Sequence, residues 1–171
     1  GALCSLVANK VQPAVLYRAE ADASLRRPQG WPHAAMSTVR TFIVEDNPTI
    51  RENLVGTLRE VARVDPVGLA DTEAESTRWL TRNMALWDLA IVDLFLKDGT
   101  GLSVLQACRH RDPAQKMVVL SNHATPDMRR RCLQLGADAV FDKATEVDDL
   151  IDYCLRRRQA RFTTTAASYP P

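Results

Sequence analysis

The sequence has no apolar run long enough to cross a membrane. A membrane-spanning helix needs roughly 18 or more consecutive apolar residues, and no stretch of this 171-residue chain approaches that length. The N-terminus also lacks the charged segment followed by an apolar segment that is typical of a secretory signal. We therefore expect a cytoplasmic protein without a membrane partner.

The sequence also lacks an excess of one charge and a closely spaced pair of cysteines. The net charge is +1 and the two signs are interspersed, so no global field indicates nucleic acid as a partner. No CxxC pair indicates a zinc or redox site. The four cysteines are Cys4, Cys108, Cys132 and Cys154. The last three fall at apolar positions of predicted helices, where thiols act as small hydrophobic side chains.

The chain divides into three parts, and its 46% hydrophobic content is enough for a sizeable core. Residues 1–37 contain several prolines and no sustained apolar period, so we expect a poorly ordered N-terminal extension or a remnant of cloning. A helical turn near 11–21 is the alternative. Residues 38–160 form the predicted domain, and the polar residues 161–171 form a flexible C-terminal tail.

From Val39 onward, short apolar runs alternate five times with amphipathic stretches, which is typical of a parallel sheet covered by helices. Three of the runs show no polar alternation, as expected of strands buried on both faces. Pro66 makes the second run a candidate for an edge strand. The predicted strands are 39–44, 64–70, 89–92, 117–120 and 139–141.

Apolar residues at helical spacing predict a helix after each strand. The fourth helix is followed by Gly136, a residue that suits a helix C-terminus. The five apolar stripes are Ile50, Leu54, Leu58 and Val61; Ala74, Trp79, Leu80 and Met84; Leu102, Leu105 and Cys108; Met128, Cys132 and Leu135; and Val147, Leu150, Ile151, Cys154 and Leu155.

Residues that can do chemistry follow four of the predicted strands. Glu45 and Asp46 follow the first, Asp93 the third, Ser121 the fourth and Lys143 the fifth. In open parallel sheets, sites form where strand C-termini meet the following loops. Three carboxylates gathered there would repel one another unless a cation lies among them, and hard oxygen ligands suit Mg²⁺.

Each of these residues also has a simpler interpretation. Glu45 and Asp46 could serve as capping and dipole partners of the first helix, while Ser121 could be a turn residue and Lys143 a surface lysine. Asp93 is harder to explain in this way, because an unpaired carboxylate at the end of an apolar strand is costly. A phosphoryl-accepting cleft needs a nucleophilic oxygen, a hydroxyl and an ammonium, and the joint placement of the five residues favours such a site.

Four segments resemble the CheY-like receiver domain of two-component response regulators. They are FIVEDNPTIRENL, DLAIVDLFLKDGTGLSVL, VVLSNHA and GADAVFDKA, within residues 39–158. The resemblance implies a doubly wound, five-stranded parallel sheet of order 2-1-3-4-5, of the flavodoxin-like type. It also implies a Mg²⁺ site, with Mn²⁺ as an alternative, made by Glu45, Asp46, Asp93 and the backbone carbonyl of Phe95. Asp93 would be the phosphoacceptor, Ser121 and Phe141 the switch residues and Lys143 the partner of the phosphate.

The resemblance further implies a sensor histidine kinase or a phosphotransfer protein as phosphodonor, and a downstream protein that binds the face of helix four, strand five and helix five. A homodimer is a further alternative. About ten residues follow the fifth predicted helix, so we expect a stand-alone regulator without a DNA-binding output domain, or a truncated piece of a longer regulator. We expect a phosphoacceptor that assists its own phosphorylation and dephosphorylation, and not an enzyme with a separate substrate.

Three positions depart from the family pattern, and two other functions are alternatives to a phosphorylated receiver. Lys97 and Ala144 stand where the family usually has proline, and Asn122 stands where it has a small residue; these changes bear on loop rigidity and on access to Asp93. A hydrolase of the haloacid dehalogenase kind needs a second acid two residues after the nucleophile, and Phe95 cannot serve as one. A degenerate receiver that binds partners without phosphorylation is disfavoured by the complete acidic set.

Overall fold

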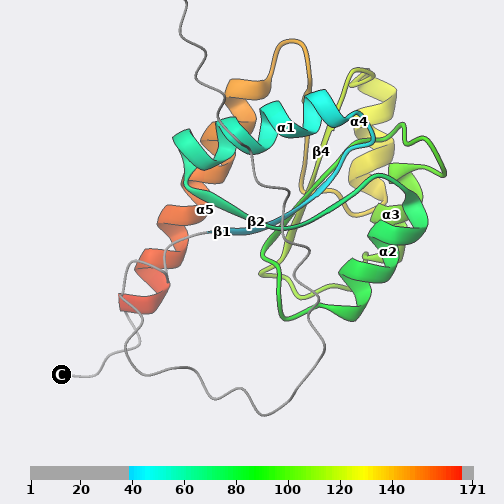
Figure 1. Ribbon diagram of the computed structural model, residues 1–171. Helices are drawn as coiled ribbons and strands as arrows, with labels where there is room; N and C mark the ends of the chain where they lie inside the picture. Colours follow the sequence, from blue (N-terminus) through cyan, green and yellow to red (C-terminus); the bar gives the residue numbers. More distant parts are fainter. Residues whose placement is uncertain (1–38, 167–171) are drawn as a thin grey trace, which may run out of the picture. The chain divides into compact units, whose positions relative to one another are not determined.

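The computed structural model describes the backbone of residues 39–166, and the side chains of residues 39–160 apart from residue 65 (Figure 1). The predicted N-terminal extension at 1–37, including the helical turn near 11–21, lies outside the described residues. The same holds for the last part of the predicted tail, residues 167–171. The elements are β1 (Val39–Val44), α1 (Pro48–Thr57), the π-helical turn η2 (Leu58–Ala62), β2 (Val64–Ala70), α2 (Glu73–Arg82), β3 (Leu89–Val92), α3 (Gly101–Ala107), β4 (Lys116–Ser121), α4 (Pro126–Gln134), β5 (Ala139–Asp142) and α5 (Val147–Ala166).

The five strands form a parallel sheet of order β2-β1-β3-β4-β5, which confirms the predicted doubly wound fold. The first three strands have the predicted bounds, and β4 and β5 are slightly longer than expected. Pro66 lies in β2 at the edge of the sheet, as predicted. The register of β1 with β2 shifts between Thr41 and Phe42, so β2 contains one extra residue there.

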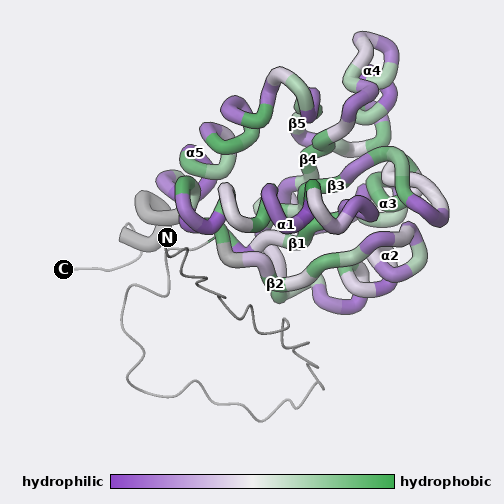
Figure 2. Tube along the Cα trace, turned by 45° about the horizontal axis from the view of Figure 1, so that its top comes forward, coloured by the Kyte–Doolittle hydropathy of each residue, from purple (hydrophilic) through white to green (hydrophobic). Residues whose placement is uncertain are grey.

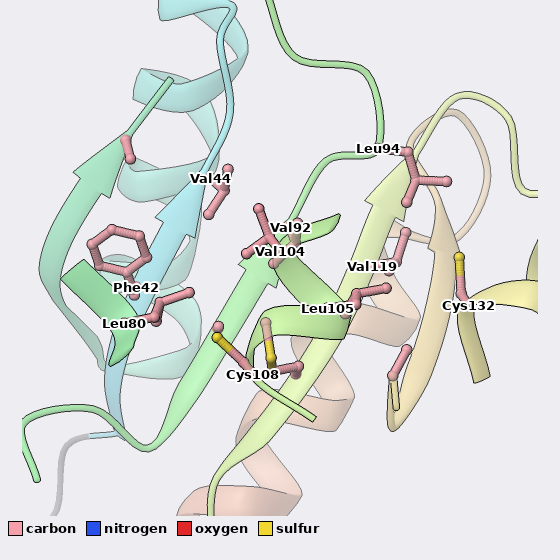
Figure 3. Close-up of a cluster of buried hydrophobic side chains, with 14 of the residues drawn as sticks. Phe42, Val44, Leu80, Val92, Leu94, Val104, Leu105, Cys108, Val119 and Cys132 are labelled. Carbon is pink, nitrogen blue, oxygen red and sulfur yellow. The ribbon is translucent and has the colours of Figure 1, made fainter. Parts of the chain in front are cut away.

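The core consists of two clusters of buried side chains, one on each face of the sheet. Figure 3 shows the first cluster, which α2, α3 and α4 cover with side chains such as Leu80, Leu105 and Cys132. The second cluster is covered by α1, η2 and α5. Successive residues of β3 alternate between the two, since Val92 belongs to the first cluster and Ile91 to the second. This arrangement explains why the central strands are apolar throughout.

The apolar stripes predicted for the first two helices were partly wrong. Val61 is 53% exposed, because it lies in η2, where the wider π-helical turn changes the direction of the side chains. Met84 is exposed because α2 already ends at Arg82, and the Asn83 side chain then donates to the Trp79 carbonyl oxygen at 2.8 Å. Ala74 is exposed as well, in the first turn of α2.

The apolar stripes predicted for the last two helices begin within α4 and α5, since Met128 lies in the first turn of α4 and Val147 is the first residue of α5. After α4, Gly136 has the positive φ of 102° that ends helices with a left-handed residue. Along α5, green and purple segments alternate in Figure 2, in keeping with one apolar face whose buried residues are Leu150 and Cys154. This helix continues to Ala166, past residue 160, where the predicted domain ends.

Candidate functional site

Three carboxylates lie together at the C-terminal edge of the sheet. Val44 of β1 is paired with Val92 of β3, so the residues that follow them, Glu45 and Asp93, emerge side by side. An oxygen atom of each of these two carboxylates and one of Asp46 lie within 4.8 Å of one another. Glu45 is only 2% exposed and Asp93 is 7% exposed. The structure therefore brings together the acidic residues that the sequence singled out.

Lys143 reaches this cluster from the loop after β5. Its ammonium donates to Glu45 Oε2 at 2.5 Å and to Asp93 Oδ2 at 2.7 Å. Burial lowers the pKa of Lys143, but the hydrogen bonds and charges of Asp93 and Glu45 together raise that pKa above its usual value. The lysine is therefore cationic near neutral pH and bridges two buried anions. It is not a surface lysine.

Backbone hydrogen bonds fix the positions of these side chains. The Glu45 N–H donates to the Ala70 carbonyl oxygen at 3.0 Å, and the Asp93 N–H donates to the Val44 carbonyl oxygen at 2.9 Å. The Asn47 side chain caps α1 by accepting from the N–H groups of the two residues after Pro48. The capping role that Glu45 and Asp46 could have had is therefore filled by Asn47.

The two predicted switch residues lie on the neighbouring strands β4 and β5. Ser121 is fully buried at the end of β4, and its Oγ accepts from the His123 N–H at 3.4 Å. Phe141 is buried in β5, where its ring makes an edge contact with Tyr153 at a centroid distance of 5.9 Å. Phe141 thus lies in the second core cluster, with its ring directed inward.

Phe95 and His123 form a ring contact that the sequence did not indicate. Their ring centroids are 4.5 Å apart, and both residues are exposed. The Phe95 N–H also donates to Asp93 Oδ1 at 3.4 Å. The contact therefore joins the loop after β3 to the loop after β4 next to the acidic cluster. The role of the Phe95 carbonyl as a metal ligand stays a prediction.

The family profile described as the response regulator receiver domain matches residues 41–154. The chain belongs to this family. The virulence transcriptional regulatory protein PhoP of Shigella flexneri is 27% identical to this receiver domain over 135 residues, which cover 78% of this chain and 59% of that protein. The transcriptional regulatory protein PhoP of Escherichia coli K12 gives the same values. The chain thus spans about three fifths of the length of these relatives.

Solved receiver domains share the fold. The signal receiver domain of NarL from Mycobacterium tuberculosis has a TM-score of 0.62 at 24% identity, covering 71% of this chain and 97% of that one. The response regulator domain of CheB from Thermotoga maritima has a TM-score of 0.60 at 14% identity, covering 78% of this chain and 99% of that one. In the part of the receiver domain that the structure describes, no helix is both long and apolar enough to span a bilayer.

The side chains of the acidic cluster fit a divalent cation. Three carboxylates carry three negative charges when ionised, and Lys143 supplies one positive charge. The remaining charge of about −2 suits a divalent ion, and carboxylate oxygens are the ligands that Mg²⁺ prefers. Mn²⁺ accepts the same ligands.

The loop after β3 of this receiver domain is held by the turn after β2, although Lys97 stands where the family has proline. Lys97 Nζ donates to Asp71 Oδ2 at 2.5 Å. The Glu73 side chain accepts from the Thr100 N–H at 2.8 Å, and the Glu73 N–H donates to the Asp98 carbonyl oxygen at 3.0 Å. These contacts to the turn after β2 restrain the loop that carries Phe95. They take the place of the restraint that a proline ring at position 97 would give.

Proposed function

We propose that Asp93 accepts a phosphoryl group in a Mg²⁺-dependent reaction, and that a sensor histidine kinase or a phosphotransfer protein donates it. The observation that carries this proposal is the buried Asp93 carboxylate beside Glu45 and Asp46, with the Lys143 ammonium 2.7 Å away. Family membership supports the same assignment.

The reaction follows from the groups present. An Asp93 carboxylate oxygen attacks the phosphorus atom, and an acyl phosphate forms as the bond between phosphorus and the donor's imidazole nitrogen breaks. The electron pair of that bond stays on the imidazole nitrogen. The other ring nitrogen of the phosphorylated donor carries a proton, so the ring leaves as neutral imidazole. Lys143 offsets the charge that develops on the phosphoryl oxygens, and the Ser121 hydroxyl offers them a hydrogen bond. A bound Mg²⁺ would be held by Glu45, Asp46 and Asp93 and would supply further charge compensation.

The proposed output is a switch between two states. New negative charge at Asp93 would attract the Ser121 hydroxyl and change the packing of Phe141. The face of α4, β5 and α5 would then bind a downstream protein or a second copy of the chain. The PhoP relatives are named as transcriptional regulators and are longer than the matched region. A stand-alone regulator without a nucleic-acid partner therefore stays a prediction.

We also propose that the chain is a phosphoacceptor and not an enzyme with a separate substrate. The haloacid dehalogenase route needs a carboxylic acid two residues after the nucleophile, and that residue is Phe95, whose ring contacts His123. A cytoplasmic location suits the proposal, because Cys108, Cys132 and Cys154 are free thiols, as is usual for cytosolic proteins.

Phosphorylation can be tested with acetyl phosphate or beryllofluoride in the presence of Mg²⁺. We expect mass spectrometry to detect a phosphorylated protein, and Asp93→Asn, which keeps the side-chain volume, to abolish the modification while the fold persists. Asp46→Ala should weaken modification through lost metal binding. Lys143→Ala should retain metal binding but uncouple the switch. Modification of Asp93→Asn at another residue would overturn the assignment of the acceptor.

A further inference from the structure

The Arg129 side chain connects three segments around the site. From α4, its guanidinium donates to the Ala124 carbonyl oxygen at 2.9 Å, to the Val140 carbonyl oxygen at 2.6 Å and to Glu146 Oε2 at 2.7 Å. These acceptors belong to the loop after Ser121, to β5 and to the loop that carries Lys143. A planar guanidinium with several fixed donors suits such a junction better than the single ammonium of a lysine does.

Glu146 closes the loop that presents Lys143. The same Oε2 atom that accepts from Arg129 also accepts from the Asp142 N–H at 2.7 Å, and the Glu146 N–H donates back to the Asp142 carbonyl oxygen at 2.9 Å. Lys143 follows Asp142 directly, and its own N–H donates to the Ser121 carbonyl oxygen at 3.2 Å. The backbone of Lys143 is therefore held on one side by β4 and on the other by Glu146.

We propose that Arg129 and Glu146 are positioning residues that hold Lys143 toward Asp93. Ala144 stands where the family usually has proline, so no ring fixes the backbone after Lys143, and the ion pair supplies the restraint instead. Neither residue touches the acidic cluster through any contact that the described residues show, so both act through Lys143. The inference rests on the proposed function, because the position of the ammonium matters once a phosphoryl group is present.

The test measures a phosphoryl analogue and the metal separately. Beryllofluoride binding in saturating Mg²⁺ is followed by fluorine NMR, and Mg²⁺ binding alone by amide chemical shifts. We expect Arg129→Ala and Glu146→Ala each to weaken beryllofluoride binding by about three- to tenfold, the scale of one or two hydrogen bonds. Mg²⁺ affinity should not fall, because the metal ligands lie on other loops and a less restrained Lys143 competes less with the cation for Glu45 and Asp93.

The matched control is Arg130→Ala on the same helix. The Arg130 side chain is 68% exposed and pairs with Asp127 on the preceding turn. We expect this variant to bind beryllofluoride as the unmodified protein does. Glu146→Gln, which keeps an acceptor oxygen without the charge, should lie between Glu146→Ala and the unmodified protein. This variant keeps the test informative if Glu146→Ala fails to fold.

A double-mutant cycle decides whether the pair acts through Lys143. If it does, adding Glu146→Ala to Lys143→Ala causes no further loss of beryllofluoride affinity. Additive losses, or equal losses in Mg²⁺ and beryllofluoride binding, would overturn the inference. So would unchanged binding in both single variants. Failure of the unmodified protein to bind beryllofluoride would instead refute the proposed function.

Discussion

Three exposed side chains lie in the loops that follow β3 and β4. The exposed rings of Phe95 and His123 are in contact, and Asn122 is exposed directly before His123. A phosphorylated Asp93 loses its phosphoryl group when a water molecule attacks in line with the leaving oxygen, and the reaction depends on the exact approach of that water. The size of these side chains therefore bears on the lifetime of the phosphorylated state.

We expect Asn122→Ala to accelerate autodephosphorylation, because a smaller side chain opens the path for water. The rate can be measured after removal of excess acetyl phosphate, by the decline of the phosphorylated mass. Thr125→Ala controls for a general loosening of this loop, because it removes the side-chain cap of α4 at an exposed position. An unchanged or slower rate in Asn122→Ala would contradict the steric explanation.

The three described cysteines should resist alkylation in the folded protein. Burial raises the pKa of Cys154 to about 12 and also raises the pKa of Cys108 and of Cys132. Since the thiolate is the reactive form, these residues stay protonated and inaccessible at pH 8. Residue-resolved mass spectrometry after treatment with N-ethylmaleimide should find them unmodified in buffer and modified in denaturant. Rapid labelling of Cys154 in buffer would show that the second core cluster opens.

At the scale of elements, the start of α3 approaches the end of β3 closely. A Cβ atom on Gly101 would lie 2.1 Å from the Asp93 carbonyl oxygen, and the Gly101 N–H donates to the Leu94 carbonyl oxygen at 3.0 Å. Glycine is therefore required for steric reasons at this junction. The position of Asp93 depends on the absence of a side chain eight positions later in the sequence.

We expect Gly101→Ala to lower the free energy of unfolding by about 1–3 kcal/mol, the usual cost of overpacking. We also expect it to slow phosphorylation, because the Asp93 backbone must move.

Gly56→Ala is the matched control. A Cβ atom on Gly56, inside α1, would meet nothing within 4 Å, so alanine should stabilise the protein by about 0.5–1 kcal/mol through its better helix propensity. Denaturant unfolding measures both, and equal stability of the two variants would contradict the steric reading.

Much of the fold was predictable because a parallel sheet buried on both faces needs strands that are apolar throughout. This requirement placed β3 at its observed bounds, and the alternation of short apolar runs with amphipathic stretches placed β1 and β2. The gathering of Glu45, Asp93 and Lys143 was predictable for a related reason, since the C-terminal ends of parallel strands meet at one edge.

Other features leave no periodic signal in the sequence. The π-helical turn that exposes Val61 depends on tertiary packing, which overrides the apolar spacing. Arg129 and Glu146 are 17 positions apart, so their pairing leaves no local pattern. In the sequence each resembles an ordinary solvated charge on a helix or in a loop. The Phe95–His123 contact joins two loops whose conformations the sequence does not specify.

At the scale of the whole domain, each face of the sheet is covered by its own set of helices. The site lies at the edge where both layers end, so its residues come from loops and the core remains apolar. Loops that follow rigid strands can change without loss of the core, which suits a switch. A ligand that binds at this edge of the folded domain then stabilises the helix layers on both faces together.

The acidic cluster should reduce the thermodynamic stability of the apo domain. Lys143 contacts Glu45 and Asp93, while Asp46 adds a third negative charge within 4.8 Å of both. Close like charges repel by about 1 kcal/mol even at the dielectric constant of water. We expect Asp46→Asn to raise the melting temperature by a few degrees in chelator, as measured by calorimetry.

Saturating Mg²⁺ should reverse this order, because it stabilises only the form of the domain that binds it. A variant that melts no higher than the unmodified domain in chelator would argue against this interpretation. On this interpretation the receiver domain exchanges intrinsic stability for the capacity to bind a cation, and we expect its melting temperature to report the free Mg²⁺ concentration.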